Sequence, residues 1–184
     1  KRFFEIECSD AGLVTLAVRR QVDLLMTDKL HEFVAKLKTE GPAWVSEVKD
    51  ALGEVTVTVP RENILQVCLY LKTGLGFDLL ADLCGADRGP EEEPRFEVNY
   101  HLFSTTHHQR LRLKVLLSED DPSVKSVTSI WKTAEWHERE TYDLVGVIFE
   151  DHPDLRRILL PSDFDGYALR KDYPLRGYEP YSMN

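Results

Sequence analysis

The hydrophobic positions in the first third of the chain predict three helices and one strand. Apolar residues recur at helical spacing in KLHEFVAKLKTEG, and Gly41-Pro42 ends this helix. A second, short helix is expected from Trp44 to Leu52, and a third through RENILQVCLYLKTGLG. Between the last two, EVTVTVP alternates valine with threonine, which predicts a half-buried strand closed by Pro60.

The middle of the chain has the two-residue period of β-structure. RFEVNYHLFS and RLRLKVLLS both alternate apolar with polar residues across a short polar turn, so they predict a hairpin. FDLLADLCGAD predicts a short apolar strand before them. Next, we expect a helix through VTSIWKTA capped by Ser126, a helix through EWHERETYDLV ended by Gly146, and a last strand VIF. The predicted fold class is α+β, with a mixed, mainly antiparallel sheet, packed helices and an extended C-terminal arm.

The chain changes character after residue 152. Residues 153–184 hold four of the nine prolines and show little periodicity, yet they are rich in leucine and tyrosine. A segment so apolar and so interrupted needs a surface to lie on. We therefore expect an α+β domain over residues 1–152, in which residues 1–53 form an N-terminal helical part, and an extended docking arm over residues 153–184.

Composition narrows the function. The 184 residues are 42% hydrophobic and 30% charged, with a net charge of −9, which disfavours broad binding to nucleic acid or to an anionic membrane. No apolar run approaches the roughly 18–20 residues of a membrane helix. The three cysteines, Cys8, Cys68 and Cys84, have no ligand-like spacing, and we expect Cys68 and Cys84 to be inert core thiols.

Short motifs give little support for chemistry by this chain. His137-Glu138 begins like the zinc motif H-E-x-x-H, but Thr141 stands where the second histidine is needed, so a surface histidine is expected. TGLGFDLLADLCGADRG lacks the G-x-G-x-x-G order and follows a helix instead of a strand. We therefore expect no catalytic, cofactor-binding or metal-binding residue. His-Pro-Asp at residues 152–154 is the signature of J-domain co-chaperones, but here it follows a strand and an acidic helix.

The helix EWHERETYDLV carries opposite charges along one face. Glu135, Arg139 and Asp143 are spaced i, i+4, i+8, which is compatible with a solvated helix stabilised by surface pairs. A sharper hypothesis is that Glu140 or Asp143 pairs with Arg156 or Arg157 and folds the start of the arm back onto the domain. Arginine suits this role because its fork can hold a carboxylate with two bonds.

One long stretch resembles a known family. E-R-E-x-Y-D-L-x-G, H-P-D-L-R-R-I-L and L-R-K-D-Y-P-L follow one another within residues 136–179. They resemble the diagnostic region of the 30-kDa subunit, also called the C subunit, of respiratory complex I, the proton-pumping NADH:quinone oxidoreductase. The resemblance extends over roughly residues 54–178. Asp151 stands where this family usually has glycine before His-Pro-Asp.

The resemblance implies a structural, non-catalytic subunit of the peripheral arm of that complex. It implies docking on the quinone-site D subunit, with the B and I subunits as neighbours, and FMN, iron–sulfur clusters and quinone in the partner subunits only. It implies a peripheral place on the cytoplasmic side of the bacterial inner membrane, or the matrix side in mitochondria. Alternatives are the equivalent subunit of a related membrane-bound hydrogenase or ferredoxin-linked complex, and an HPD-containing co-chaperone. The expected docking and structural residues are Glu138, Arg139, Glu140, Tyr142, Asp143, His152, Pro153, Asp154, Arg156, Arg157, Arg170, Lys171, Asp172 and Tyr173.

Overall fold

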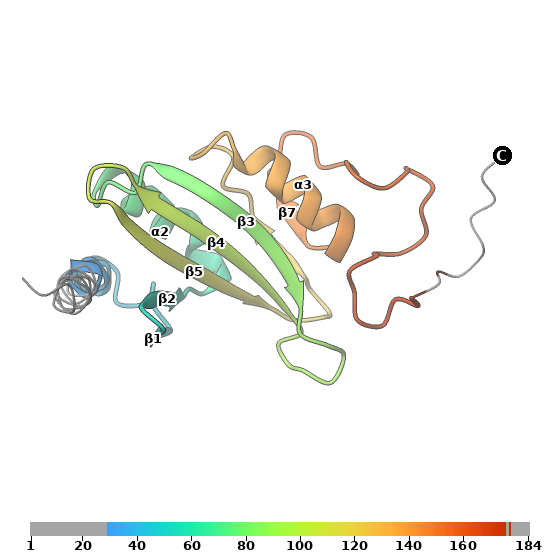
Figure 1. Cartoon of the computed structure of the whole chain (residues 1–184), viewed down its shortest axis with the longest axis horizontal. Coiled ribbons are helices and arrows are strands. Elements are labelled where there is room, and N and C mark those ends of the chain that lie inside the picture. Colours follow the sequence, from blue (N-terminus) through green and yellow to red (C-terminus); the bar gives the residue numbers. More distant parts are fainter. Residues whose placement is uncertain (1–28, 176, 178–184) are drawn as a thin grey trace, which may run out of the picture.

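The computed structural model describes residues 29–175 and residue 177. Its centre is a five-stranded sheet in the order β1-β2-β5-β4-β3 (Figure 1). β2 and β5 run parallel, and the other neighbouring pairs are antiparallel. The mixed, mainly antiparallel sheet predicted from the sequence is thus confirmed. The strands are β1 (Glu47–Ala51), β2 (Glu54–Thr58), β3 (Leu79–Asp87), β4 (Phe96–Ser104) and β5 (Gln109–Leu117).

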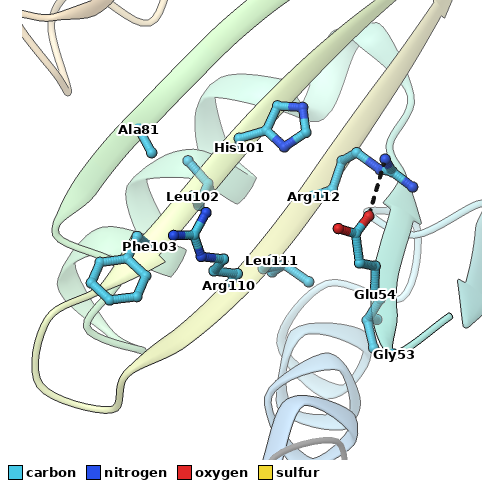
Figure 2. A pocket seen from close by; sticks show the side chains of 10 residues that line it. Gly53, Glu54, Ala81, His101, Leu102, Phe103, Arg110, Leu111 and Arg112 are labelled. Carbon is cyan, nitrogen blue, oxygen red and sulfur yellow. Dashed lines mark ion pairs between the residues drawn. The ribbon is translucent and has the colours of Figure 1, made fainter. Parts of the chain in front are cut away.

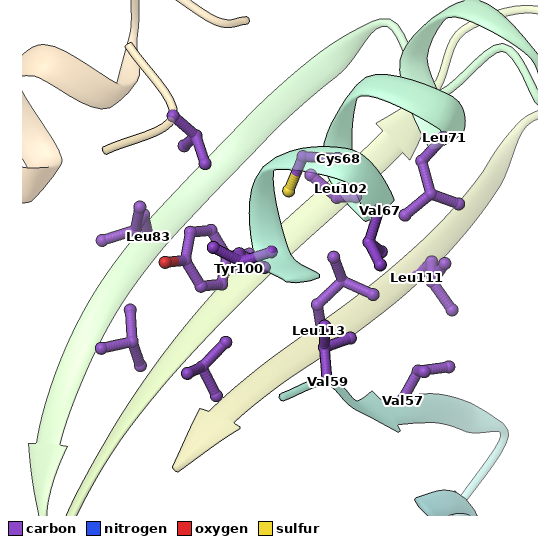
Figure 3. Close-up of a cluster of buried hydrophobic side chains, with 14 of the residues drawn as sticks. Val57, Val59, Val67, Cys68, Leu71, Leu83, Tyr100, Leu102, Leu111 and Leu113 are labelled. Atoms are coloured by element: carbon purple, nitrogen blue, oxygen red, sulfur yellow. The ribbon is translucent and has the colours of Figure 1, made fainter. Parts of the chain in front are cut away.

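The predicted hairpin is β4 and β5. The two strands pair from Phe96↔Leu117 to Ser104↔Gln109 without a register shift. Both strands alternate buried with partly exposed residues, as the two-residue period required. The buried positions face α2 (Ile64–Thr73), whose Val67, Cys68 and Leu71 point at the sheet in Figure 3.

The prediction of a helix from Trp44 to Leu52 is wrong. Residues 47–51 form β1, which pairs antiparallel with β2. Leu52 and Gly53 both have positive φ, 56° and 78°, which is the geometry of a two-residue hairpin turn. The helix-like composition of EVKDA is overruled here by the hydrogen bonds that β2 offers. The predicted N-terminal helical part therefore contains a strand, and residues 1–28 lie outside the described part of the chain.

The other helices confirm the helical spacing seen in the sequence. Residues 29–40 are helical, and their apolar residues join the core through contacts such as Phe33 with Phe77. A short 3-10 turn, η1 (Arg61–Asn63), leads into α2. Cys68 is buried in the core, as expected, but Cys84 lies on the outer face of β3 and is exposed. The prediction that Cys84 is a core thiol is therefore wrong. Successive residues of β3 point to opposite faces of the sheet, so Cys84 points away from the core that buries Leu83.

The chain after β5 adds a two-stranded sheet and a helix, whose buried apolar residues join the same core. β6 (Ser123–Lys125) and β7 (Ile148–Glu150) form a parallel pair, and α3 (Ala134–Val145) lies between them in sequence. The prediction of a helix through VTSIWKTA is also wrong. This stretch forms turns, in which the carbonyl oxygens of Val127 and Trp131 accept backbone N–H groups from residues three or four positions later. The Ser126 hydroxyl accepts the N–H of Thr128 at 3.2 Å, so it closes a turn and caps no helix.

α3 lies close against β3 (Figure 1) because residue 85 is glycine. The Gly85 N–H donates to Thr141 Oγ1 at 3.1 Å, and a Cβ at this position would lie 2.4 Å from Thr141 Cγ2. Beyond β7, the described residues of the arm form neither helix nor strand, and Figure 1 shows them beyond the end of α3. Within the described residues, no helix has the length and apolar character needed to span a membrane.

Candidate functional site

The charged helix α3 is not a solvated helix. Glu138, Arg139, Thr141 and Asp143 are all buried, although α3 has a low overall hydrophobicity. Buried charges are stable only where hydrogen bonds or opposite charges replace water. The partners of Arg139 and Asp143 come from the arm that follows β7, whereas Glu138 accepts the N–H of Val127 and Thr141 that of Gly85. Through Arg139 and Asp143, the helix and the arm form one polar site. We call this site the arm clasp: α3 together with residues 152–173.

Asp143 is the acceptor at the centre of the arm clasp. Its Oδ2 accepts three consecutive backbone N–H groups, from Ile158 at 3.0 Å, Leu159 at 2.7 Å and Leu160 at 2.9 Å. Its Oδ1 accepts Arg157 Nη1 at 2.8 Å. Burial alone would raise the pKa of Asp143, but these hydrogen bonds outweigh it and the pKa is lowered.

Arg157 connects Asp143 to the rest of the arm. Its Nη2 donates to the carbonyl oxygens of Phe164 at 3.1 Å and Gly166 at 2.9 Å, and its guanidinium lies over the rings of Phe164 and Tyr167. The side chain is 19% exposed. The sequence-based pairing of Asp143 with Arg157 thus matches the structure. Glu140 lies on the exposed side of the helix, so its proposed pairing does not form among the described contacts.

Arg139 binds the backbone of the arm, not Glu135 and Asp143 as its spacing along the helix had suggested. Its Nε donates to the Arg156 carbonyl and its Nη2 to the Arg157 carbonyl, both at 3.1 Å. Its guanidinium also lies 5.3 Å from the ring of Trp136. The Arg156 side chain is 71% exposed and pairs with Asp154 two residues before it, at 2.8 Å. Arg139 therefore holds the backbone of the arm, while the side chain of Arg156 faces solvent.

Arg170 closes the C-terminal end of α3. Its Nε donates to the Val145 carbonyl at 2.7 Å, one of the carbonyls that a helix end leaves without an internal partner. The guanidinium lies between the rings of Phe96 and Tyr167, at 4.9 and 4.5 Å. Gly146 makes this approach possible, because its φ is 85° and a Cβ there would lie 2.6 Å from Arg170 Nη2.

A second ion cluster fixes the far end of the described arm. Arg95 is 2% exposed and donates to both oxygens of Asp87, at 3.0 and 2.8 Å, and to Asp172 at 2.9 Å. The Lys171 N–H donates to Asp87 Oδ2 at 2.8 Å. The side-chain hydrogen bonds from Arg95 lower the pKa of Asp87, and Asp87 in turn raises the pKa of Arg95. Glu119 also pairs with Arg95. The sequence pointed to Lys171 and Asp172 but not to Arg95 or Asp87.

The side chain of His152, immediately before the arm, is buried. Its Nδ1 accepts the Asp154 N–H at 3.0 Å, so Nε2 carries the proton and donates to the Glu135 carbonyl at 3.1 Å. Its side chain is fully buried, 3.9 Å from Glu138 Oε2. The preceding Asp151 adopts φ 63°, the conformation for which glycine is suited, and its carboxylate binds Lys125 at 2.9 Å. The His-Pro-Asp segment is therefore a structural turn of this fold.

Glu138 is held in an environment that disfavours its charge. Its Oε1 accepts the Val127 N–H at 2.8 Å, whereas Oε2 is buried and has no hydrogen-bond partner among the described residues, as is also true of the Tyr100 hydroxyl. Burial raises the pKa of Glu138 from 4.5 to about 7, and hydrogen bonds from Ser126 and Val127 offset part of that rise.

This environment predicts a pH-dependent stability. The folded chain keeps the Glu138 proton at pH values where the unfolded chain has lost it, so stability falls as the pH rises from the ordinary glutamate range to about 7. Between about pH 5 and about pH 8, the free energy of unfolding of the wild type should fall by up to about 3 kcal/mol, as measured by urea unfolding. Glu138→Gln should remove this fall, because glutamine does not ionise. The exposed Glu140→Gln is the matched control and should leave the pH dependence unchanged. A Glu138→Gln variant with the wild-type pH dependence would contradict this prediction.

The remaining predicted residues occupy the outer parts of the arm clasp. The rings of Tyr142 and Tyr167 lie edge to face at 6.5 Å, and those of Phe164 and Tyr173 stack at 5.6 Å. Pro153 is exposed in the turn. The arm also leaves large apolar side chains outside: Leu159 is 60% exposed, Leu169 59% and Leu175 104%. The clasp thus binds the arm through its polar groups and leaves leucines on its outer surface.

Comparison with known proteins identifies the family. The family model described as "Respiratory-chain NADH dehydrogenase, 30 Kd subunit" matches residues 57–179. The chain belongs to this family. A similar protein, the C subunit of the NADH-quinone oxidoreductase of Geobacter metallireducens, is 48% identical over 150 residues, covering 80% of this chain and 93% of the relative. The protein of the same name from Geobacter sulfurreducens is 47% identical over the same shares of both chains.

Two solved structures share the fold. The trypsin-resistant fragment 1–134 of Nqo5 is 32% identical, with a TM-score of 0.60, covering 68% of this chain and 98% of that chain. A chain of the archaeal membrane-bound sulfane sulfur reductase has a TM-score of 0.68, covering 80% of this chain and 86% of that chain. At 24% identity, the second likeness shows the fold alone. The predicted family and the α+β fold are confirmed.

Proposed function

We propose that this chain is a structural, non-catalytic subunit in the peripheral arm of a proton-pumping NADH:quinone oxidoreductase, and that its C-terminal arm docks on the quinone-site D subunit. Membership of the 30-kDa subunit family supports the complex, because similar proteins are named as the C subunit of NADH-quinone oxidoreductase. In this proposal the B and I subunits are neighbours, and FMN, iron–sulfur clusters and quinone belong to partner subunits. The chain lies peripherally on the cytoplasmic side of the bacterial inner membrane, or on the matrix side in mitochondria.

One observation carries the docking part of the proposal. The arm clasp fixes the arm from inside through Asp143 and Arg157, while Leu159, Leu169 and Leu175 remain exposed along it. A segment fixed in one conformation loses little further conformational entropy on binding, and its exposed leucines gain by leaving water. The arm is therefore suited to an apolar partner surface. The co-chaperone alternative has no such support, because the side chain of His152 is fully buried in its own fold.

We expect a charge on the outer side of the arm to block assembly. Leu169→Asp should lower the amount of complex that co-purifies with the tagged chain about tenfold or more, because a carboxylate would be desolvated in an apolar interface. Partners are quantified by mass spectrometry after pull-down from cells. The same purified complex is then assayed for its electron donor. Oxidation of NADH supports the proposed complex, whereas oxidation of hydrogen would favour the related hydrogenase-type complex.

A matched control separates docking from general surface effects. Leu52 is 105% exposed at the β1–β2 turn, outside the arm, and its φ of 56° tolerates aspartate. Leu52→Asp should co-purify as much complex as the wild type. Equal losses in both variants, or full assembly of Leu169→Asp with unchanged thermal unfolding, would overturn the docking of the arm.

A further inference from the structure

Three side chains of metal-ligand type meet on the outer face of the sheet, beside α3. Asp82 and Cys84 stand two residues apart on β3, and His101 lies directly across from Asp82 on β4. One ligand atom from each lies within 4.8 Å of the other two. Residues i and i+2 of a strand share a face with the residue opposite on the next strand, so the sheet itself brings these three groups together.

A β-bulge creates this arrangement. Leu80 pairs with Leu102, but the next pair is Asp82 with His101, so Ala81 is the extra residue on β3. In a regular ladder continued from the Leu80–Leu102 pair, Asp82 would lie opposite Tyr100, whose side chain faces the buried side of the sheet. The bulge keeps both Leu80 and Leu83 in the core and turns Asp82 and Cys84 to the face of His101.

We propose that Asp82, Cys84 and His101 bind a divalent zinc ion. A thiolate, an imidazole and a carboxylate are the three donor types that zinc takes in proteins, and three protein ligands with an open fourth position are a common zinc arrangement. Cys84 is exposed, so the ion can reach it from solvent. On binding, the thiol proton leaves to solvent and the thiolate sulfur bonds to zinc.

The surroundings of the three ligands favour a cation. The negative charges of Asp82, Glu97 and Glu140 act on the Cys84 thiol, and the positive charge of Arg112 acts in the opposite direction. Figure 2 shows Arg112 on the same face as His101, but its guanidinium is occupied by Glu54 at 3.4 Å and by the Thr56 hydroxyl at 2.8 Å. Glu97 is likewise paired, with Lys114 at 2.6 Å. The carboxylates of Asp82 and Glu140 therefore provide the negative charge that attracts a divalent cation to the thiol.

His137 of α3 lies next to Asp82 at the edge of the site. Its Nδ1 lies 3.6 Å from Asp82 Oδ1, and its side chain is 30% exposed. A histidine that holds a ligating carboxylate orients it toward the metal, and loss of such an outer partner typically weakens metal binding 10- to 100-fold. We assign His137 as a positioning residue, through which the ion would link β3 to α3.

The test is cobalt and zinc binding by the full 184-residue chain after treatment with a chelator. Cobalt(II), used as a spectroscopic substitute for zinc, should give a thiolate-to-cobalt charge-transfer band that zinc removes in a 1:1 ratio. Cys84→Ser should abolish the band, and His101→Gln should weaken zinc binding at least about tenfold. His137→Gln should weaken binding about tenfold yet keep the band, since the thiolate remains.

Two controls make the outcome decisive. His31 and Asp50 form another surface His–Asp pair, at 3.3 Å, with no thiol in the pair, so His31→Gln should leave the affinity unchanged. Cys8→Ser should leave the band unchanged. The proposal fails if no band forms, if Cys84→Ser keeps it, or if the Kd for zinc is about 1 mM or weaker. The metal-free variants should unfold at the same temperature as the metal-free wild type. A loss of zinc binding then reflects the missing ligand and not a loss of the fold.

Discussion

Replacing Arg157 with alanine is expected to release the arm from α3 and to lower the free energy of its local opening by about 3–5 kcal/mol. The substitution removes the cation from Asp143 Oδ1, which stays buried at 0% exposure, and frees the Phe164 and Gly166 carbonyls. The amides of Ile158, Leu159 and Leu160, which donate to Asp143, should exchange with solvent far faster. Hydrogen exchange and limited proteolysis measure this directly.

Arg156 provides the matched control within the same dipeptide. Its side chain is 71% exposed and binds only its near neighbour Asp154 among the described contacts, so Arg156→Ala should leave exchange and proteolysis of the arm unchanged. Arg157→Lys should give an intermediate result, because one ammonium cannot reproduce the fork that spans Asp143 and two carbonyls. Replacing both arginines should lower the amount of assembled complex, and we attribute that loss to Arg157. Equal effects of the two single alanine variants would refute the arm clasp.

The parts of the fold with a clear period could be predicted from the sequence. The alternation in β4 and β5 predicted both their pairing and their buried face, because only one register places all the apolar side chains on one side. The stretch from Glu47 to Ala51 has no such period, and its pairing with β2 overruled a helix-like composition. The expected helix at VTSIWKTA failed for a similar reason, since Ser126 closes a turn with Thr128.

The candidate site could be predicted only where its partners are near in sequence. Asp143 and Arg157 are fourteen residues apart, and a charged helix followed by an apolar arm with arginines suggested their contact. Asp87 and Lys171 are eighty-four residues apart and meet only because the sheet, α3 and the arm are folded together. The Asp82, Cys84 and His101 group was missed because it depends on a bulge at Ala81 that shifts the register by one residue. The D-x-C spacing on a strand beside a histidine-bearing strand is the signal that could have indicated it.

The second large effect is expected at Arg95. Arg95→Met should destabilise the whole chain by about 3–5 kcal/mol, since it leaves Asp87 buried without its cation, and Glu119 and Asp172 also lose a partner. Because the pKa of Asp87 is lowered in the fold, its contribution to stability is present above the ordinary aspartate pKa and is lost as the pH falls through the lowered value. Urea unfolding near neutral pH is therefore the appropriate measurement.

Two further variants separate the buried pair from loss of charge in general. Arg88 is 33% exposed, pairs with Glu92 and donates to the Pro94 carbonyl at 2.7 Å, so Arg88→Met should cost only about 1–2 kcal/mol. The double replacement Arg95→Met with Asp87→Leu should recover much of the stability lost in Arg95→Met, because no unpaired charge then remains in the interior. The arm end at Asp172 and Lys171 would still lose its bonds to Arg95 and Asp87 in that variant. If the double variant recovers stability but its arm is protease-sensitive, this cluster has two separable effects, one on the domain and one on the arm. A double variant that is no more stable than Arg95→Met would contradict the argument from the unpaired carboxylate.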